Sequence, residues 1–106
     1  MVHAGEDAKG WLAGAWESSL PVSIGYATEG VDAPHRHGMV TEVFLVAAGE
    51  VTAVVDRAEV RLVAGDVLIV EPDEVRSFMA SSCDYRCFVL HVGGDGSTDR
   101  IDVSDP

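Results

Sequence analysis

The chain has 106 residues, of which 47% are hydrophobic, and carries a formal net charge of −11. That length suits one domain and is too short for two, and the hydrophobic share is enough for a packed core. The negative charge disfavours nucleic-acid and membrane partners, because it would repel phosphate backbones and anionic headgroups. No apolar run approaches the roughly 20 residues that span a bilayer, and the first residues lack the features of a secretory signal. We therefore expect a cytoplasmic protein.

Short apolar runs rich in Val, Ile, Leu and Phe follow one another along the chain. In chain order they predict strands at Trp11–Trp16, Val22–Ala27, Glu42–Ala47, Glu50–Val55, Glu59–Val63, Val67–Val70, Val75–Met79 and Tyr85–Val92. Turn-forming residues separate several of them, as at Gly49 and at Gly65 with Asp66. Regularly spaced short strands in so small a domain predict an all-β antiparallel sandwich or barrel.

Two polar segments flank these strands. Residues 1–8 are expected to be loosely held, and residues 94–106 are acidic and turn-rich, which predicts a weakly held tail. A single domain then covers residues 1–106, with its core at about residues 9–93.

The chain contains two cysteines, Cys83 and Cys87. In one extended strand their Cα atoms would lie about 13 Å apart, which is too far for a disulfide. Their spacing also differs from Cys-x-x-Cys metal motifs. The pair is therefore read as two buried or half-buried thiols in a reducing compartment.

A histidine pair and a glutamate carry the strongest chemical signal. His35 and His37 lie two residues apart, so in a strand they project from one face about 7 Å apart. Pro34 favours an extended backbone before the pair. Glu42 shares its strand parity with Phe44, which places this carboxylate on an apolar inner face, where it needs a partner. If the three groups converge, they form a facial triad that suits Fe(II), Mn(II), Ni(II) or Zn(II).

The spacing of these residues resembles the first motif of the cupin superfamily. His35-x-His37 is followed after four residues by Glu42 and after six more by Gly49, with Gly30 five residues before His35. The segment from 65 to 78 is similar to the second motif, and both motifs with the strands between them cover about residues 20–92. The resemblance implies a double-stranded β-helix, a cupin-type jelly-roll barrel that is usually dimeric. It also implies a site in the barrel mouth, with the triad as metal ligands and catalytic residues.

The chain departs from that family at Arg76, where many metal-binding cupins carry a third histidine. Arginine cannot ligate a metal. A guanidinium about 5 Å from a divalent ion would repel it by about 6–7 kcal/mol at an effective dielectric near 20. Three arrangements stay open. Arg76 turns away toward solvent or an anionic ligand, or pairs with Glu42 in a metal-free site, or clamps the carboxylate or phosphate of a substrate that also reaches the metal.

Other residues are weaker candidates. His91 lies on the last predicted strand and could turn inward as a replacement ligand, although an isolated histidine in an apolar strand is more often a core or rim residue. The aromatic and cationic residues that could line the barrel mouth are Lys9, Trp11, Trp16, Tyr26 and Tyr85. His3 is read as a terminal residue without a role.

These features favour a cupin that binds a divalent metal and a small anionic molecule, as a metal-dependent oxygenase, isomerase or lyase. A second version drops the metal and uses His35 or His37 as general base near Glu42. The alternative from another class is a metal-free binding or sensing cupin without catalysis. No helix-turn-helix pattern or basic patch accompanies the barrel, so a regulator of this kind would need a separate protein partner. Whether the protein is an enzyme stays open, and the resemblance implies a homodimer.

Overall fold

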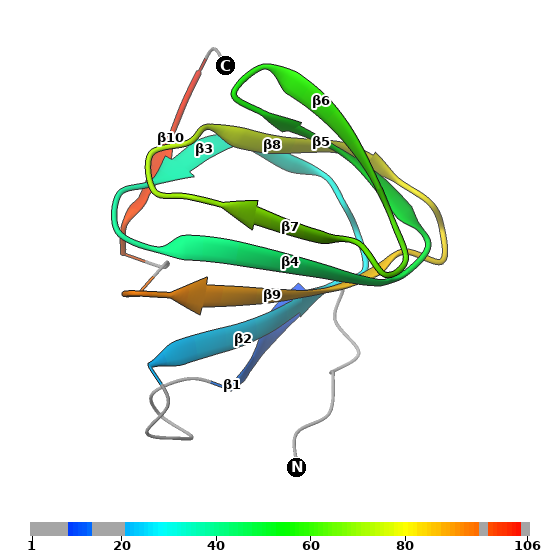
Figure 1. Ribbon diagram of the computed structural model, residues 1–106, viewed down its shortest axis with the longest axis horizontal. Helices are drawn as coiled ribbons and strands as arrows, with labels where there is room; N and C mark the ends of the chain where they lie inside the picture. Colours follow the sequence, from blue (N-terminus) through cyan, green and yellow to red (C-terminus); the bar gives the residue numbers. More distant parts are fainter. Residues whose placement is uncertain (1–8, 14–20, 96–97, 105–106) are drawn as a thin grey trace.

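The computed structural model describes residues 9–13, 21–95 and 98–104, which form ten strands (Figure 1). They are β1 (Lys9–Ala13), β2 (Val22–Ala27), β3 (Asp32–His37), β4 (Thr41–Ala48), β5 (Glu50–Val55), β6 (Ala58–Val63), β7 (Val67–Val70), β8 (Arg76–Ser81), β9 (Arg86–Val92) and β10 (Arg100–Asp102). This part of the chain has no helix long and apolar enough to span a membrane.

The strands form two antiparallel sheets that face each other. Sheet A has the order β1-β2-β9-β4-β7, and sheet B has the order β10-β3-β8-β5-β6 (Figure 1). Neighbours in each sheet are mostly distant in sequence, as in the pairs of β4 with β9 and of β3 with β8. The predicted all-β fold is confirmed.

The apolar runs located most strands well. Three predictions coincide with the observed bounds of β2, β5 and β7, and the predictions for β4, β6, β8 and β9 differ from them by one or two residues. For the first run, Trp11–Trp16, the structure gives β1 at Lys9–Ala13, and Trp16 lies outside the described residues. Alternating hydropathy was informative because each of these strands has one face in the core.

The C-terminal segment differs from the weakly held tail that its composition suggests. Arg100–Asp102 forms β10, which pairs with β3 and becomes the edge strand of sheet B, and the amide of Val103 donates to the carbonyl of Pro34 at 3.0 Å. An edge strand offers unpaired backbone groups, and a short polar segment can satisfy them without burying apolar side chains. Hydropathy therefore gave no signal for β10.

The core lies between the sheets, and some of its residues also line the cavity described below. Its buried residues are Phe44, Val46, Val51, Ala53, Leu62, Val70, Phe78, Tyr85 and Cys87. Phe44 of sheet A and Phe78 of sheet B meet across the layers with ring centroids 4.9 Å apart. Cys87 is buried and Cys83 is exposed, and both are free thiols.

Gly49 joins β4 to β5 at a position that only glycine fits. Its φ is +70°, and a Cβ there would lie 2.5 Å from the Ser82 hydroxyl oxygen and 2.7 Å from the Tyr85 Cα. Gly30 is also crowded, because a Cβ would lie 2.5 Å from the Val51 side chain. These two glycines of the first motif are therefore needed for turn geometry and for close packing.

Candidate metal centre

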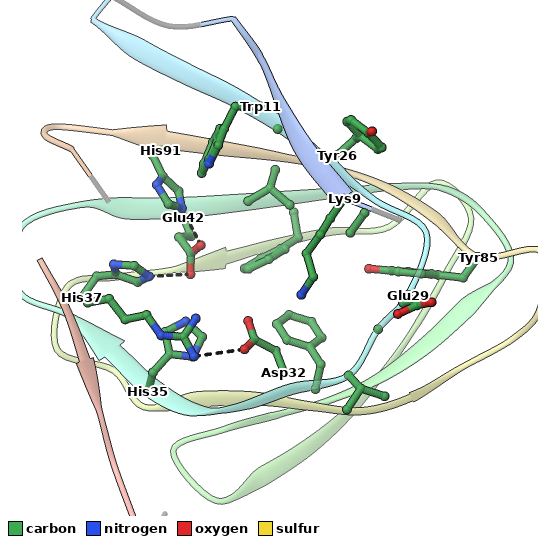
Figure 2. A pocket seen from close by; sticks show the side chains of 18 residues that line it. Lys9, Trp11, Tyr26, Glu29, Asp32, His35, His37, Glu42, Tyr85 and His91 are labelled. Carbon is green, nitrogen blue, oxygen red and sulfur yellow. Dashed lines mark hydrogen bonds and ion pairs between the residues drawn. The ribbon is translucent and has the colours of Figure 1, made fainter. Parts of the chain in front are cut away.

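A cavity of about 290 Å³ lies between the two sheets. Figure 2 shows His35, His37, Glu42 and His91 gathered at one end. Glu29 and Tyr85 lie toward the other end, and Lys9 extends into the space between (Figure 2). Phe44, Phe78 and Val89 contribute apolar wall. The volume is at the lower end of the range typical of small-molecule sites.

His35, His37 and Glu42 converge as the sequence predicted. The two histidines come from β3 of sheet B and the glutamate from β4 of sheet A, and the exposed fractions of the three residues are only 3%, 3% and 5%. One ligand atom from each lies within 4.8 Å of the others. Side-chain shifts of about 1 Å would bring these atoms to the metal–ligand distances of about 2.0–2.2 Å that imidazole and carboxylate make.

The histidine rings are oriented by hydrogen bonds at Nδ1. In His35 this nitrogen donates to the carbonyl of Ala33 at 2.8 Å, and in His37 it donates to Oδ1 of Asp99 at 2.7 Å. A carbonyl and a carboxylate only accept, so Nδ1 carries the proton and Nε2 keeps its lone pair. Burial lowers the pKa of His35, which favours the neutral ring. Both Nε2 atoms are therefore available as ligands.

Asp99 also contributes to the candidate site, although no pattern in the sequence pointed to it. Besides His37, its carboxylate accepts from the amides of Met39 at 2.8 Å and Val40 at 2.9 Å. Burial opposes ionisation, but these hydrogen bonds outweigh it and lower the pKa of Asp99 to about 2. Asp99 precedes β10, so only the pairing of β10 with β3 brings it to the site.

Three side chains lie close to the Glu42 carboxylate. Nε2 of His91 donates to its Oε2 at 2.6 Å, while Nε2 of His37 lies 3.6 Å and Nε of Arg76 lies 3.5 Å from its Oε1. Burial raises the pKa of this carboxyl, but the hydrogen bond from His91 and the neighbouring charges outweigh that effect and lower it. Oε1 is buried and has no hydrogen-bond partner. Glu42 is therefore ionised and keeps one free acceptor near the histidines.

His91 contributes to the site by its hydrogen bond to Glu42. It faces Glu42 directly in the β4–β9 register, is 5% exposed, and contacts the ring of Trp11 with centroids 4.7 Å apart. As a donor to Glu42, its Nε2 carries a proton and has no lone pair for a metal. The strand parity that it shares with Cys87 and Val89 was the available signal that it points inward.

Arg76 lies behind Glu42, inside the barrel. It is 0% exposed and faces His35 in the β3–β8 register. Its Nη2 donates to the carbonyl of Glu71 at 3.3 Å, whereas Nε and Nη1 have no hydrogen-bond partner. A turn toward solvent is therefore ruled out, and of the three expected arrangements the contact with Glu42 is the one observed. Arg76 is not among the described residues that line the cavity.

Residues 24–93 match the family described as cupin domain, which is most of the chain. The chain belongs to the cupin family.

Solved structures share the architecture of this cupin at low sequence identity. Pac13 from Streptomyces with uridine is 11% identical, with 97% of this chain and 83% of that chain covered and a TM-score of 0.73. KdgF from Halomonas sp. is 16% identical, with 92% and 89% covered and a TM-score of 0.70. A cupin from Bacteroides fragilis is 18% identical, with 98% and 84% covered and a TM-score of 0.64. A comparison with curated protein sequences finds no match.

Most of the weaker candidate residues of this cupin line the cavity. Lys9, Trp11, Tyr26 and Tyr85 line it, whereas Trp16 and His3 fall outside the described residues. Arg100, which the sequence did not suggest, lines it too and forms ion pairs with Asp32 at 3.1 Å and Asp102 at 2.9 Å.

The donor set fits a divalent transition metal. Two neutral imidazole nitrogens and one carboxylate oxygen without a hydrogen-bond partner lie together in a buried position. Two histidines and one carboxylate form the facial set that leaves positions open for an exogenous ligand. His35, His37 and Glu42 could therefore hold such an ion.

Proposed function

We propose that this cupin binds a divalent transition metal at His35, His37 and Glu42 and a small anionic molecule in the adjoining cavity, as a metal-dependent lyase, isomerase or oxygenase. The observation that carries the proposal is the convergence of two oriented Nε2 atoms and the free Oε1 of Glu42. Fe(II), Mn(II), Ni(II) and Zn(II) all accept this ligand set. A bound ion would supply Lewis acidity or redox chemistry at the end of the cavity.

The protein residues then have distinct tasks. His35 and His37 present Nε2 because Ala33 and Asp99 hold their Nδ1 protons. His91 fixes the Glu42 carboxylate through its bond to Oε2. The apolar walls keep water away from part of the cavity, which strengthens electrostatic interactions within it.

Lys9 is the residue that we propose to bind the anionic group of the ligand. Of the two cations among the described cavity-lining residues, Arg100 is already paired with Asp32 and Asp102. The Lys9 ammonium extends into the cavity without an ion pair (Figure 2). The structure of Pac13 with uridine supports a small organic ligand in a barrel of this architecture.

A metal-free binding or sensing cupin is the second candidate, and the surroundings of Glu42 favour it. Arg76 and His91 already compensate the buried Glu42 carboxylate, so this carboxylate has partners without an ion. In this version His37 and Glu42 would contact the ligand directly.

Elemental analysis of protein purified without metal-affinity chromatography separates these two functions. We expect about one equivalent of transition metal after incubation with Fe(II), Mn(II), Ni(II) or Zn(II) in acetate buffer and desalting into the same buffer, and its loss in His35→Ala. His3→Ala removes a histidine outside the triad and should keep the metal. Lys9→Met should also keep the metal but bind small carboxylates more weakly. Wild-type protein that retains none of the four ions would favour the metal-free function.

We also propose a homodimer that forms through the outer face of sheet A. In the observed register, most residues on that face are apolar, in successive rows across four strands, with Thr41 as a polar member of the Val22–Val92 row. They are Val22, Ile24, Val43, Leu45, Val67, Ile69, Phe88, Leu90 and Val92. The outer face of sheet B instead carries Glu59 and Arg61. A continuous apolar face of this kind is typical of a surface covered by a partner.

A further inference from the structure

The groups in direct contact with the triad carry almost balanced charges. Asp99 accepts from His37 at 2.7 Å, and Nε of Arg76 lies 3.5 Å from Glu42. With neutral imidazoles, two carboxylates and one guanidinium leave a single negative charge in excess. Glu74 also attracts Arg76, but it is partly exposed, and water screens its charge.

A divalent ion would reverse that balance. Added to this cluster, it leaves a single positive charge in excess, in a place where Arg76 is 0% and Glu42 is 5% exposed. Buried uncompensated charge is unfavourable because little solvent is present to stabilise it. Among the described residues, the other nearby carboxylates are paired or exposed to water, since Asp32 is paired with Arg100, Glu74 is partly exposed and Asp56 is exposed. The missing negative charge therefore has to come from the cavity, which adjoins the triad.

We infer that Arg76 makes metal binding and anion binding depend on each other, so that the site holds a divalent ion tightly only together with a small monoanion such as a carboxylate. This inference rests on the proposed metal-binding function and specifies the ligand by its charge. Arg76 acts without touching the ligand, because it lies behind Glu42 and outside the cavity lining. By linkage, the ion strengthens anion binding by the same factor as the anion strengthens ion binding.

Isothermal titration calorimetry of the wild-type protein with Mn(II) tests the dependence directly. We expect saturating acetate to raise the Mn(II) affinity by about 5- to 150-fold, the range of typical coupling between sites. Acetamide has nearly the same shape without the charge and should leave the affinity unchanged within about twofold.

Two substitutions identify Arg76 as the cause. Arg76→Met keeps an unbranched side chain and removes the charge, so Mn(II) should bind at least about tenfold more tightly without acetate, and acetate should then add less than about twofold. Arg76→Lys keeps the charge and should retain the wild-type dependence on acetate.

The outcomes separate this inference from the function on which it rests. Mn(II) binding to wild-type protein that is equally tight with and without acetate overturns the inference and leaves the metal function standing. Equal effects of acetate and acetamide also overturn it, because charge is then not the cause. If neither wild-type nor Arg76→Met binds Mn(II) or Zn(II) under any of these conditions, the proposed metal function fails as well.

Discussion

Tyr85 shows how strongly the interior of the barrel acts on a single residue. The phenol is 4% exposed, lines the cavity and interacts with the thiol of Cys87. Burial, together with the hydrogen bond to Cys87, raises the pKa of Tyr85 well above its ordinary value near 10. Burial also raises the pKa of Cys87. Both groups are therefore neutral in the folded protein under ordinary conditions.

This pKa shift predicts a loss of stability at alkaline pH. Above about pH 10 the Tyr85 phenol ionises in the unfolded chain but not in the folded one, so the contribution of this group is complete below about pH 10 and is lost as pH rises. The free energy of unfolding should fall by up to about 1.4 kcal/mol per pH unit from this residue. Urea unfolding at several pH values between 9 and 11.5 gives the free energy of unfolding at each pH. This free energy should decrease less steeply with pH in Tyr85→Phe than in the wild type. Equal slopes in both proteins would contradict the prediction.

At the scale of elements, β10 completes the site through its pairing with β3. The register sets Arg100 opposite His37 and Asp102 opposite His35. Asp99, the residue before β10, thereby accepts from His37 and from two amides of the β3–β4 connection. A three-residue strand thus determines the orientation of a candidate metal ligand. A carboxylate that accepts from the Nδ1 proton of a histidine fixes the tautomer of that histidine.

Asp99→Asn should therefore weaken both folding and metal binding. The single side-chain oxygen of asparagine can accept either from His37 or from the Met39 and Val40 amides, so its NH2 group faces a donor at the other position. Loss of a charge-assisted hydrogen bond costs about 1.5–3 kcal/mol of unfolding free energy. The metal affinity should fall by about 10- to 100-fold. Because the pKa of Asp99 is lowered to about 2, its stabilisation is complete above about pH 4 and lost as pH falls toward 2.

Asp102→Asn is the matched control for this substitution. Asp102 lies on the same strand, but its side chain is 80% exposed and contacts Arg100. In chemical unfolding and Mn(II) titration, the free energy of unfolding and the Mn(II) affinity of Asp102→Asn should be close to those of the wild type. Similar losses in the two variants would show that the acidic character of the segment matters and not the bond to His37.

At the scale of the whole molecule, the outer faces of the two sheets differ in polarity. The outer face of sheet A includes Val67 and Ile69 at 54% and 56% exposure, on the edge strand β7. A stable interface buries about 800 Å² per partner, which is about an eighth of the 6185 Å² surface of this chain. The apolar rows of sheet A extend over four strands and are a suitable surface for contact of that size.

A charge on this face should dissociate the proposed dimer. Ile69→Lys places an ammonium among apolar neighbours, and we expect light scattering after gel filtration to change from a dimer to a monomer mass. Met79→Lys is the control, because Met79 is also 56% exposed but lies on sheet B. A wild-type protein that is monomeric at tens of micromolar concentration would be inconsistent with the proposal.

The sequence was sufficient for the class of fold and for the centre of the site. Strand side chains alternate between faces, so local hydropathy predicted that Glu42 points inward, and strand parity predicted that His35 and His37 share one face. The motif spacing added the cupin architecture, since Gly30 and Gly49 are required where chain segments approach closely.

Only the tertiary structure decided what surrounds the triad. Whether Arg76 contacts solvent, a ligand or Glu42 depends on how sheet B packs against sheet A. The distance between Arg76 and Glu42 does not follow from the side-chain alternation of either strand. The contacts of His91 with Glu42 and of Asp99 with His37 join residues 49 and 62 positions apart. Such pairs follow from strand order and register, which are properties of the assembled sheets. Sequence therefore determined the faces on which side chains lie, and long-range pairing determined their partners.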